Sequence, residues 1–406
     1  MATTTMTTVD NILKEVYETG INDQLQSEVT ALKRIERSSE GVTHEVGGKY
    51  VRFPIRTKRN HGIGARNEMD ALPIPRTQSY ESAQVKLKYL YGSLELTGQT
   101  FELADKNFQA FASALDQEVN GLKEGLRKDL ARQAYGTNKG VMSTANAGGT
   151  TTTFVCSDGQ AIYLEIGMFV DIFTSADASR VADVTITNIA SSGGTTTVTF
   201  TPAAGGATAS GDYITRDNSV GKEITGFGTI VASSGAACNI DPATVPVWAS
   251  YVDANGGTNR AISEGLMINT VDVIRRRGGG VPTVGFCGLG VRRAYFNLLV
   301  QQRRMTNTQE FVGGFKGLAF VTDGGEIPIV ADVDCPSNTM LFLNEKELKL
   351  YNAGDWSFMN RDGSNWQRVI TSAGTFDAYD ANLYQYTELG THRRNAHARI
   401  SDLTEG

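Results

Sequence analysis

The chain has 406 residues, of which 40% are hydrophobic and 20% charged, and its formal net charge is −6 at pH 7. This length predicts roughly two or three domains, and the near-average composition excludes wholesale disorder. The acidic balance argues against a general nucleic-acid binder, because clustered Lys and Arg drive phosphate binding. The chain shows neither a membrane-length apolar run nor a signal-peptide pattern, so we expect a protein made in the cytoplasm, without a membrane partner.

The N-terminal arm, residues 1–45, begins with a Thr-rich stretch and continues with apolar residues at helical spacing between Val9 and Ile35. These apolar residues are Ile12, Leu13, Val16, Tyr17, Ile21, Leu25, Val29 and Leu32. Such an arm has too little apolar surface to fold alone. We therefore expect it to lie on its own subunit or on the next one.

Residues 46–100, called the β-arm below, alternate apolar and polar side chains in two runs, GGKYVRFPIRTK and SAQVKLKYLYGSLELT. Between the runs lies NHGIGARNEMDALPIPR, which is too long for a tight turn. The pattern predicts two long strands joined by an open tip. Because an isolated two-stranded ribbon is marginal in water, we expect the β-arm to lie across a partner.

The β-arm is also basic. Between Gly47 and Tyr80, seven Lys and Arg residues stand against Glu68 and Asp70, so this stretch carries +5 while the whole chain carries −6. A basic projection on an acidic body is complementary between copies, which predicts inter-subunit contacts. The residues predicted to make these contacts are Arg52, Arg56, Lys58, Arg59, Arg66 and Arg76. A merely solvated loop and a DNA-binding loop are the alternatives, although the tip lacks aromatic residues for base stacking.

A long helix is predicted from Asp105 to Gly136, where apolar residues recur at steps of three and four. The stripe consists of Phe108, Phe111, Leu115, Val119, Leu122, Leu126 and Leu130. About thirty residues give a rod of roughly 45 Å. Gly121 and Gly125 weaken the helix, so the packing of the stripe must stabilise it.

Residues 141–222 are rich in Thr, Gly, Ala and Ser and contain short β runs separated by Gly-rich turns. We interpret them as a small inserted β-barrel or sandwich, either purely structural or carrying a binding surface.

From residue 223 the chain returns to mixed α and β. RAISEGLMINTVDVIRRRGGG predicts a helix that packs Val271 and Ile274 inward and ends at Gly278, and further helix and strand patterns follow. The fold class is therefore α+β.

No coherent catalytic, cofactor or metal site emerges from the sequence. Ser219 and Lys222 form an SxxK pair without its companion motifs. His392 and His397 are five apart, and no carboxylate or Cys completes a zinc set near them. The cysteines, which are far apart and form no CxxC pair, are interpreted as reduced and buried thiols; they are Cys156, Cys238, Cys287 and Cys335. We expect a protein that is not an enzyme.

The order of these segments resembles the major capsid proteins of tailed bacteriophages, which have the Hong Kong 97 fold. Five segments of the sequence carry this resemblance. GGKYVRFPIRTK and KYLYGSLELTGQTFELA resemble the family's E-loop, and NFQAFASALDQEVNGLKEGLRKDLARQAYG resembles its spine helix. VGFCGLGVRRAYFNLLVQQ resembles its A-domain, and RRNAHARISDL resembles its closing strand. The resemblance implies an N-terminal arm (1–45), E-loop and return strand (46–100), P-domain spine helix (101–140), inserted β-domain (141–222), A-domain (223–375) and C-terminal P-domain strands (376–406).

The resemblance also implies a function. Hexamers and pentamers of the chain would build an icosahedral head that encloses double-stranded DNA without sequence-specific binding. Partners would be further copies of the chain, a separate scaffolding protein, the portal and decoration proteins. The protein would assemble in the host cytoplasm and reside in the virion. An encapsulin-like compartment shell is the alternative; an adhesin built on residues 141–222 or a hydrolase finds less support, because the sequence shows neither a signal peptide nor a catalytic set.

Overall fold

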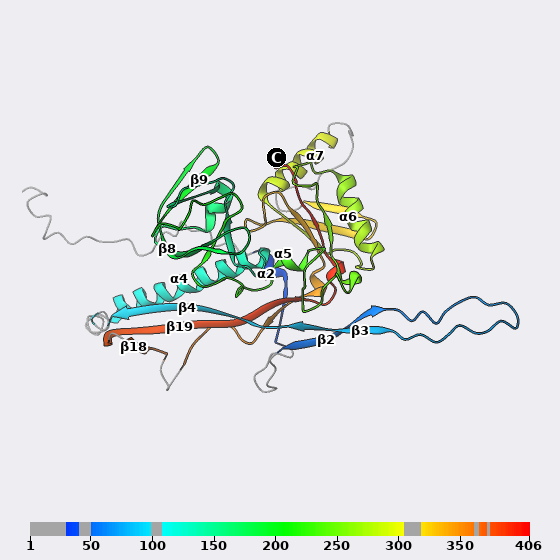
Figure 1. The fold of residues 1–406 in the computed structure, drawn as a ribbon, viewed down its shortest axis with the longest axis horizontal. Coiled ribbons are helices and arrows are strands. Elements are labelled where there is room, and N and C mark those ends of the chain that lie inside the picture. The colour runs from blue at the N-terminus through cyan, green and yellow to red at the C-terminus, as the bar shows by residue number, and fades with distance from the viewer. Residues whose placement is uncertain are drawn as a thin grey trace, which may run out of the picture.

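The computed structural model describes residues 30–39, 50–97, 99, 108–303, 318–360, 365–371 and 374–406. A long, flat base runs along one side of the molecule, and two lobes stand on it (Figure 1). A thin ribbon projects from one end of the base, beyond the lobe nearest to that end. The described strands form three six-stranded sheets and one two-stranded ribbon.

The predicted spine helix is present as α4, Phe108–Tyr135, and it lies along the strands of the base (Figure 1). Leu122 and Leu126 of its apolar stripe sit directly over Gly92, where an added Cβ would come within 2.7 Å of the Leu126 side chain. This close approach requires glycine in the strand below. The side chains of the first three residues in the stripe lie outside the described residues.

The sheet of the base combines strands from both ends of the chain. β4 pairs with β19 antiparallel, from Lys88 opposite Thr387 to Thr97 opposite Ala378. The strands of this sheet are β1 (Glu36–Ser38), β4 (Lys88–Thr97), β16 (Leu348–Asn352), β17 (Ser357–Phe358), β18 (Gln367–Thr371) and β19 (Gly374–Thr391). Because β19 pairs with four of the others, the base depends on this one long strand.

One lobe is formed by residues that follow α4. Its strands, in the order β5-β10-β7-β8-β9-β6, are β5 (Val141–Thr144), β6 (Thr153–Ser157), β7 (Phe169–Phe173), β8 (Ser179–Ser192), β9 (Thr195–Thr201) and β10 (Tyr213–Arg216). The short 3-10 helix η2 spans Asp158–Tyr163. An isolated bridge between Ala147 and Val155 joins the two edges of the sheet, which therefore curls into a barrel around Phe154, Ile172 and Phe200.

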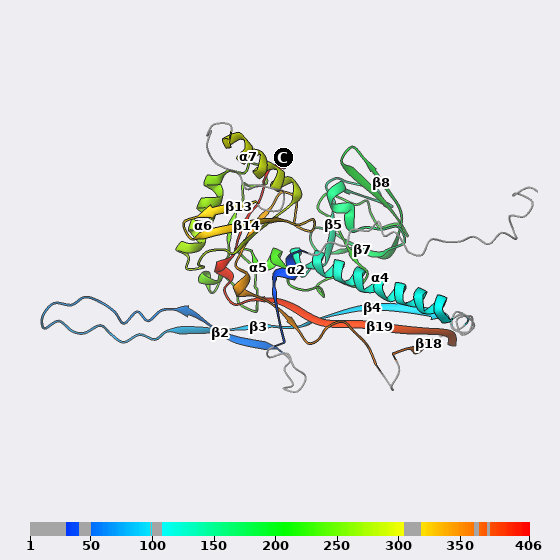
Figure 2. The ribbon, with the colours of Figure 1, turned by 180° about the vertical axis from the view of Figure 1, so that it is seen from behind.

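The other lobe packs helices on the third sheet (Figure 2). Its strands are β11 (Tyr251–Asp253), β12 (Val284–Cys287), β13 (Ala319–Thr322), β14 (Gly325–Ala331), β15 (Met340–Leu343) and β20 (Ala398–Ile400). Its helices are α5 (Phe227–Ile230), η3 (Pro246–Trp248), α6 (Glu264–Arg276), α7 (Leu289–Arg303), η4 (Glu345–Glu347) and η5 (Arg394–Ala396). Ser263 is the N-cap of α6, and its side chain accepts a hydrogen bond from the backbone N–H of Leu266. Gly278 follows the helix with a φ of +82°.

Two predicted boundaries are wrong. β16, β17 and β18 belong to the base and not to the lobe that was expected to span 223–375. Conversely, residues 376–406 do not all lie beside α4, since β20 pairs parallel with β11 and antiparallel with β15 in the third sheet. Strand partners are long-range contacts, which local patterns do not encode. Of the N-terminal arm, only α2 (Ala31–Arg34) and the residues adjoining it up to 39 fall within the described residues.

Candidate assembly interface

The β-arm forms the projecting ribbon (Figure 1). β2 (Val51–Lys58) pairs antiparallel with β3 (Ser79–Val85), and residues 59–78 connect the two strands without further strand structure. The second predicted strand is interrupted at Lys86 and Leu87, so that β4 leaves the ribbon and pairs with β19 instead of β2. The open tip was predicted, whereas this change of partner was missed.

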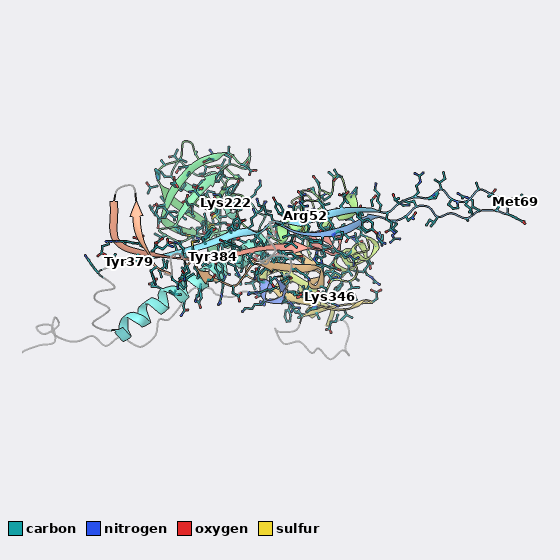
Figure 3. All side chains as sticks on the ribbon, turned by 90° about the horizontal axis from the view of Figure 1, so that it is seen from below. Arg52, Met69, Lys222, Lys346, Tyr379 and Tyr384 are labelled. Carbon is teal, nitrogen blue, oxygen red and sulfur yellow. The ribbon has the colours of Figure 1, made fainter. Side chains whose placement is uncertain are left out.

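Large apolar side chains of the tip face solvent. Ile63 is 82% exposed, Leu72 84% and Ile74 72%, and Met69 at the far end is fully exposed (Figure 3). Exposed apolar side chains on one segment mark an interaction site, because a soluble protein rarely leaves such a patch uncovered. The tip thus presents apolar surface far from the molecule's own cores.

All six basic residues predicted for the interface are exposed. Arg52, Arg56 and Lys58 share one face of β2, because every second residue of a strand points the same way. Arg59, Arg66 and Arg76 lie in the connection, where Arg66 Nε donates to the carbonyl of Ala71 at 2.7 Å. Among the described residues, none of the six forms an ion pair.

The root of the ribbon is fixed to the body. The Phe53 ring lies 4.5 Å from the His392 ring, and Gln84 N donates to the carbonyl of Cys238 at 2.9 Å. Ala83 is fully buried against Trp248. The inner face of the ribbon is therefore anchored at its root, while its outer face and tip extend freely.

A polar joint connects α4 to the barrel lobe. Asp129 accepts hydrogen bonds from Arg216 at 3.0 Å and Gln133 at 2.7 Å and pairs with Arg132, which also pairs with Glu223. Burial favours the neutral form of Asp129, but the two guanidinium groups overcome it and hold the pKa of this carboxyl below its usual value. The joint fixes the lobe on the spine.

A second set of contacts connects the lobes through Asp332 and Asp334. The hydroxyl of Tyr135 at the end of α4 donates to Asp332 at 2.9 Å, and its ring packs edge-on against Phe227 at 5.3 Å. Asp334 accepts from Lys128 of α4 and from Tyr163 of the barrel lobe, both at 2.9 Å. Helix, barrel and third sheet therefore meet at one buried point, which makes the body rigid behind the projecting ribbon.

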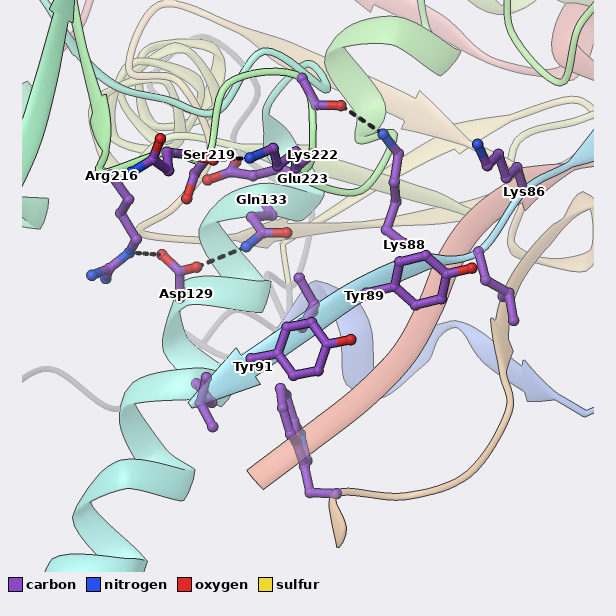
Figure 4. A pocket seen from close by; sticks show the side chains of 16 residues that line it. Lys86, Lys88, Tyr89, Tyr91, Asp129, Gln133, Arg216, Ser219, Lys222 and Glu223 are labelled. Carbon is purple, nitrogen blue, oxygen red and sulfur yellow. Dashed lines mark hydrogen bonds and ion pairs between the residues drawn. The ribbon is translucent and has the colours of Figure 1, made fainter. Parts of the chain in front are cut away.

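A groove of about 640 Å³, called the β4 groove, lies between β4, α4 and the turn after β10 (Figure 4). Its acidic groups are already bound to cations, as Asp129 is to Arg216. Ser219 and Lys222 lie in the turn, where Ser219 Oγ and Lys222 Nζ both donate to backbone carbonyls. The geometry therefore offers no activated nucleophile at this SxxK pair.

One juxtaposition was not predicted. Carboxylate oxygens of Asp171, Asp183 and Asp217 lie within 4.8 Å of one another in the barrel lobe. Asp171 accepts the backbone N–H groups of Asp183 and Asn218. The three carboxylates could ligate a cation, although such a cluster does not by itself define a site. Because the residues are far apart in sequence, no local motif could have indicated it.

Among the described helices, none is both long and apolar enough to cross a membrane. Residues 205–404 match the family described as SU10 major capsid protein. No curated protein matches the chain.

Solved structures are similar to the chain over its full length. A capsid asymmetric unit of Cyanophage A-1(L) has a TM-score of 0.63 at 13% identity, covering 99% of this chain and 100% of that one. A chain from Microbacterium phage Oxtober96 has a TM-score of 0.49 at 11% identity, covering 98% and 99%. An encapsulin complex from Synechococcus elongatus has a TM-score of 0.44 at 7% identity, covering 100% and 97%.

The family match covers about the C-terminal half, and the whole chain has the fold of a phage capsid subunit. The spine helix, the flat base, the projecting ribbon and the lobes agree with that assignment. The chain is therefore a major capsid protein of the tailed-bacteriophage type, with the Hong Kong 97 fold, and copies of it associate into the shell of the virion.

Proposed function

We propose that the β-arm is the main contact between neighbouring subunits, and that hexamers and pentamers joined in this way build an icosahedral head around double-stranded DNA. The observation that carries this proposal is the uncovered tip, where Ile63, Met69 and Leu72 are exposed. In addition, the six basic residues are exposed and form no ion pair among the described residues. Covering these apolar and charged groups with a neighbouring subunit lowers their free energy, so the outer face and the tip of the ribbon should gain stability in the assembly.

Charge complementarity would orient the ribbon on the next subunit. The ribbon is basic, whereas the chain as a whole carries −6. Attraction between exposed charges acts over roughly one Debye length and weakens as salt is added, so early assembly should be salt-sensitive. The DNA would be enclosed without sequence-specific contacts.

The remaining partners and the life cycle follow from the capsid role. We infer that assembly occurs in the host cytoplasm with a separate scaffolding protein and a portal, and that decoration proteins bind the finished shell. The role is structural and not catalytic, which agrees with the already bound polar groups of the β4 groove.

The test is a charge reversal on the ribbon. Arg56→Glu, Lys58→Glu and Arg59→Glu together should abolish particle formation, seen by electron microscopy and sedimentation, while circular dichroism and the Tm of the subunit stay unchanged. The reason is that these exposed residues contribute no ion pair within the described chain.

A matched control reverses Arg276, Arg293 and Lys346, which are also exposed and lie outside the β-arm. This control should still form particles. Wild-type particle yields from the β-arm variant would refute the proposal.

A further inference from the structure

Three carboxylates, called the aspartate cluster below, gather on the barrel lobe across three neighbouring strands. Asp171 lies in the middle of β7, Asp183 lies in β8, and Asp217 comes directly after the end of β10. β7 stands between β10 and β8 in the sheet. One carboxylate oxygen of each residue lies within 4.8 Å of the other two. The topology of the barrel therefore brings three negative charges to one place.

The alternation along the strands shows which way these side chains point. Val170 and Ile172, on either side of Asp171, belong to the core of the barrel, so Asp171 points to the outer face. The backbone N–H of Asp217 donates to the carbonyl of Phe169 at 3.3 Å, which continues the pairing of β10 with β7 by one residue. Because Phe169 precedes Asp171 by two residues, Asp217 and Asp171 lie on the same face.

Asp171 is held in place by backbone groups of both neighbours. It is only 5% exposed, its Oδ1 accepts the N–H of Asp183 at 3.0 Å, and its Oδ2 accepts the N–H of Asn218 at 2.9 Å. A carboxylate offers about four acceptor positions, so both oxygens keep capacity for a further partner. The direction of this carboxylate is therefore fixed before any ligand binds.

The aspartate cluster has no counter-ion among the described residues. None of its three members forms an ion pair there. Asp217 Oδ1 accepts a hydrogen bond from Asn218 Nδ2 at 2.8 Å, but this amide is neutral. Ionised carboxylates this close repel one another, so a positive charge between them would lower the free energy of the folded subunit.

A buried hydroxyl without a partner points toward the same cluster. Thr215 of β10 is directly opposite Asp171 of β7, and two residues paired in this way point to the same face, with their Cβ atoms roughly 5 Å apart. Thr215 is 0% exposed, and its Oγ1 has no hydrogen-bond partner within the described chain. A buried hydroxyl without a partner is costly, so a ligand that contacts it would be stabilised there. This observation is independent of the charges.

The chemistry of the four side chains selects a hard cation. All of them offer oxygen atoms, which suit Ca²⁺ and Mg²⁺. Ca²⁺ accepts irregular geometry and binds oxygen at about 2.3–2.6 Å, so ligands on opposite sides of the ion are about 5 Å apart. Mg²⁺ demands a near-ideal octahedron and usually takes only one or two carboxylates. Three carboxylates within 4.8 Å, drawn from two strands and a turn, therefore fit Ca²⁺ better.

We propose that the aspartate cluster binds one Ca²⁺ ion, with its three carboxylates and the hydroxyl of Thr215 as protein ligands. Asp183 and Asp217 are not buried, so the ion can enter from solvent. It would tie β7 and β8 to the turn after β10, which leads to Glu223 in the joint with α4. Ca²⁺ should thus stabilise the single subunit. This inference goes beyond the proposed function and does not depend on contacts between copies.

The test measures Ca²⁺ binding by the unassembled full-length subunit, after EDTA treatment and removal of the EDTA. In isothermal titration calorimetry with CaCl₂, wild type should bind one ion per chain with a Kd below about 1 mM. CaCl₂ should also raise its Tm, because a ligand that binds only the folded state stabilises it. Asp183→Asn with Asp217→Asn should weaken binding at least about ten-fold and abolish the rise in Tm.

The Tm in EDTA separates loss of the ion from loss of the fold. There the Asp183→Asn, Asp217→Asn variant should melt at or above the wild-type temperature, because the substitutions remove repulsion and keep the side-chain shape. The matched control, Glu165→Gln with Asp272→Asn, also removes two exposed carboxylates and should bind Ca²⁺ as wild type does. A wild type that binds no Ca²⁺ at about 1 mM would overturn the proposal, and so would unchanged affinity in the aspartate variant.

Two further measurements test the hydroxyl and the choice of ion. Thr215→Val keeps the branched shape but removes the oxygen, so it should weaken Ca²⁺ binding without lowering the Tm in EDTA. Unchanged affinity in this variant would overturn the assignment of Thr215 as a ligand. MgCl₂ should raise the wild-type Tm less than CaCl₂ at the same concentration, and an equal or larger rise would overturn the assignment to Ca²⁺.

Discussion

Glu388 of β19 predicts an unusual pH dependence of subunit stability. This side chain is only 4% exposed, and its Oε1 accepts the backbone N–H groups of Thr225 at 2.6 Å and Leu389 at 3.0 Å. Burial raises its pKa to about 7 from the usual 4.5, against the opposing effect of these hydrogen bonds. Glu388→Gln keeps the shape and the accepting oxygen but cannot ionise.

The sign follows from the raised pKa. Unfolding releases a proton from Glu388 at pH values between 4.5 and about 7, so its contribution to stability is fully present below pH 4.5 and is lost as the pH rises through about 7. At about 1.4 kcal/mol for each pH unit, the loss amounts to about 3 kcal/mol. The glutamine variant has no such loss, so its stability relative to wild type should rise by up to about 3 kcal/mol over this range.

The assay is urea unfolding of the unassembled subunit at several pH values from about 5 to about 8, for wild type and Glu388→Gln. Other titrating groups are common to both chains, so the difference in unfolding free energy isolates Glu388. We expect that difference to grow with pH in favour of the variant. A difference that stays constant across the range would show that Glu388 ionises normally in the folded subunit, and would refute the reasoning.

Two further predictions concern glycines. Gly226→Ala should lower the Tm and reduce the free energy of unfolding by about 1–3 kcal/mol or more, because the new Cβ would lie 2.4 Å from two backbone oxygens at the end of α4. Gly265→Ala is the control, because no atom is found within 4 Å of its added Cβ. Equal Tm values for the two variants would contradict this account of the packing at Gly226. Gly121→Ala and Gly125→Ala on α4 should each stabilise the subunit by up to about 1 kcal/mol in urea unfolding, since no described atom outside the helix's own neighbouring backbone lies within 4 Å of either added methyl. A loss of stability in either variant would contradict this prediction.

Local patterns in the sequence predicted the helices well. The step of three and four residues indicated α4, and the Ser263 cap with the positive φ of Gly278 explains why α6 lies where its pattern predicted it. These signals are carried by residues close in the chain. The same holds for the alternation along β2, whose Val51, Phe53 and Ile55 face is partly covered.

The pairing of strands could not be predicted in the same way. The alternation of residues 79–97 is nearly continuous, and only the partners across the sheet divide it into β3 and β4. The basic character of the β-arm was evident from the sequence, whereas the exposure of its tip became evident only in the structure. The contacts of its six basic residues with a neighbouring subunit stay a prediction.

The pairing of β4 with β19 has a consequence for biosynthesis. Thr97 and its partner Ala378 are separated by about 280 residues, so the ribosome must finish nearly the whole polypeptide before the base can close. At about 5–20 residues per second, a nascent β4 waits for roughly 15 to 60 s without its partner. During that delay its unpaired backbone is an edge on which two nascent chains could stick together, and we expect correct folding in the cell to depend on chaperones that cover it.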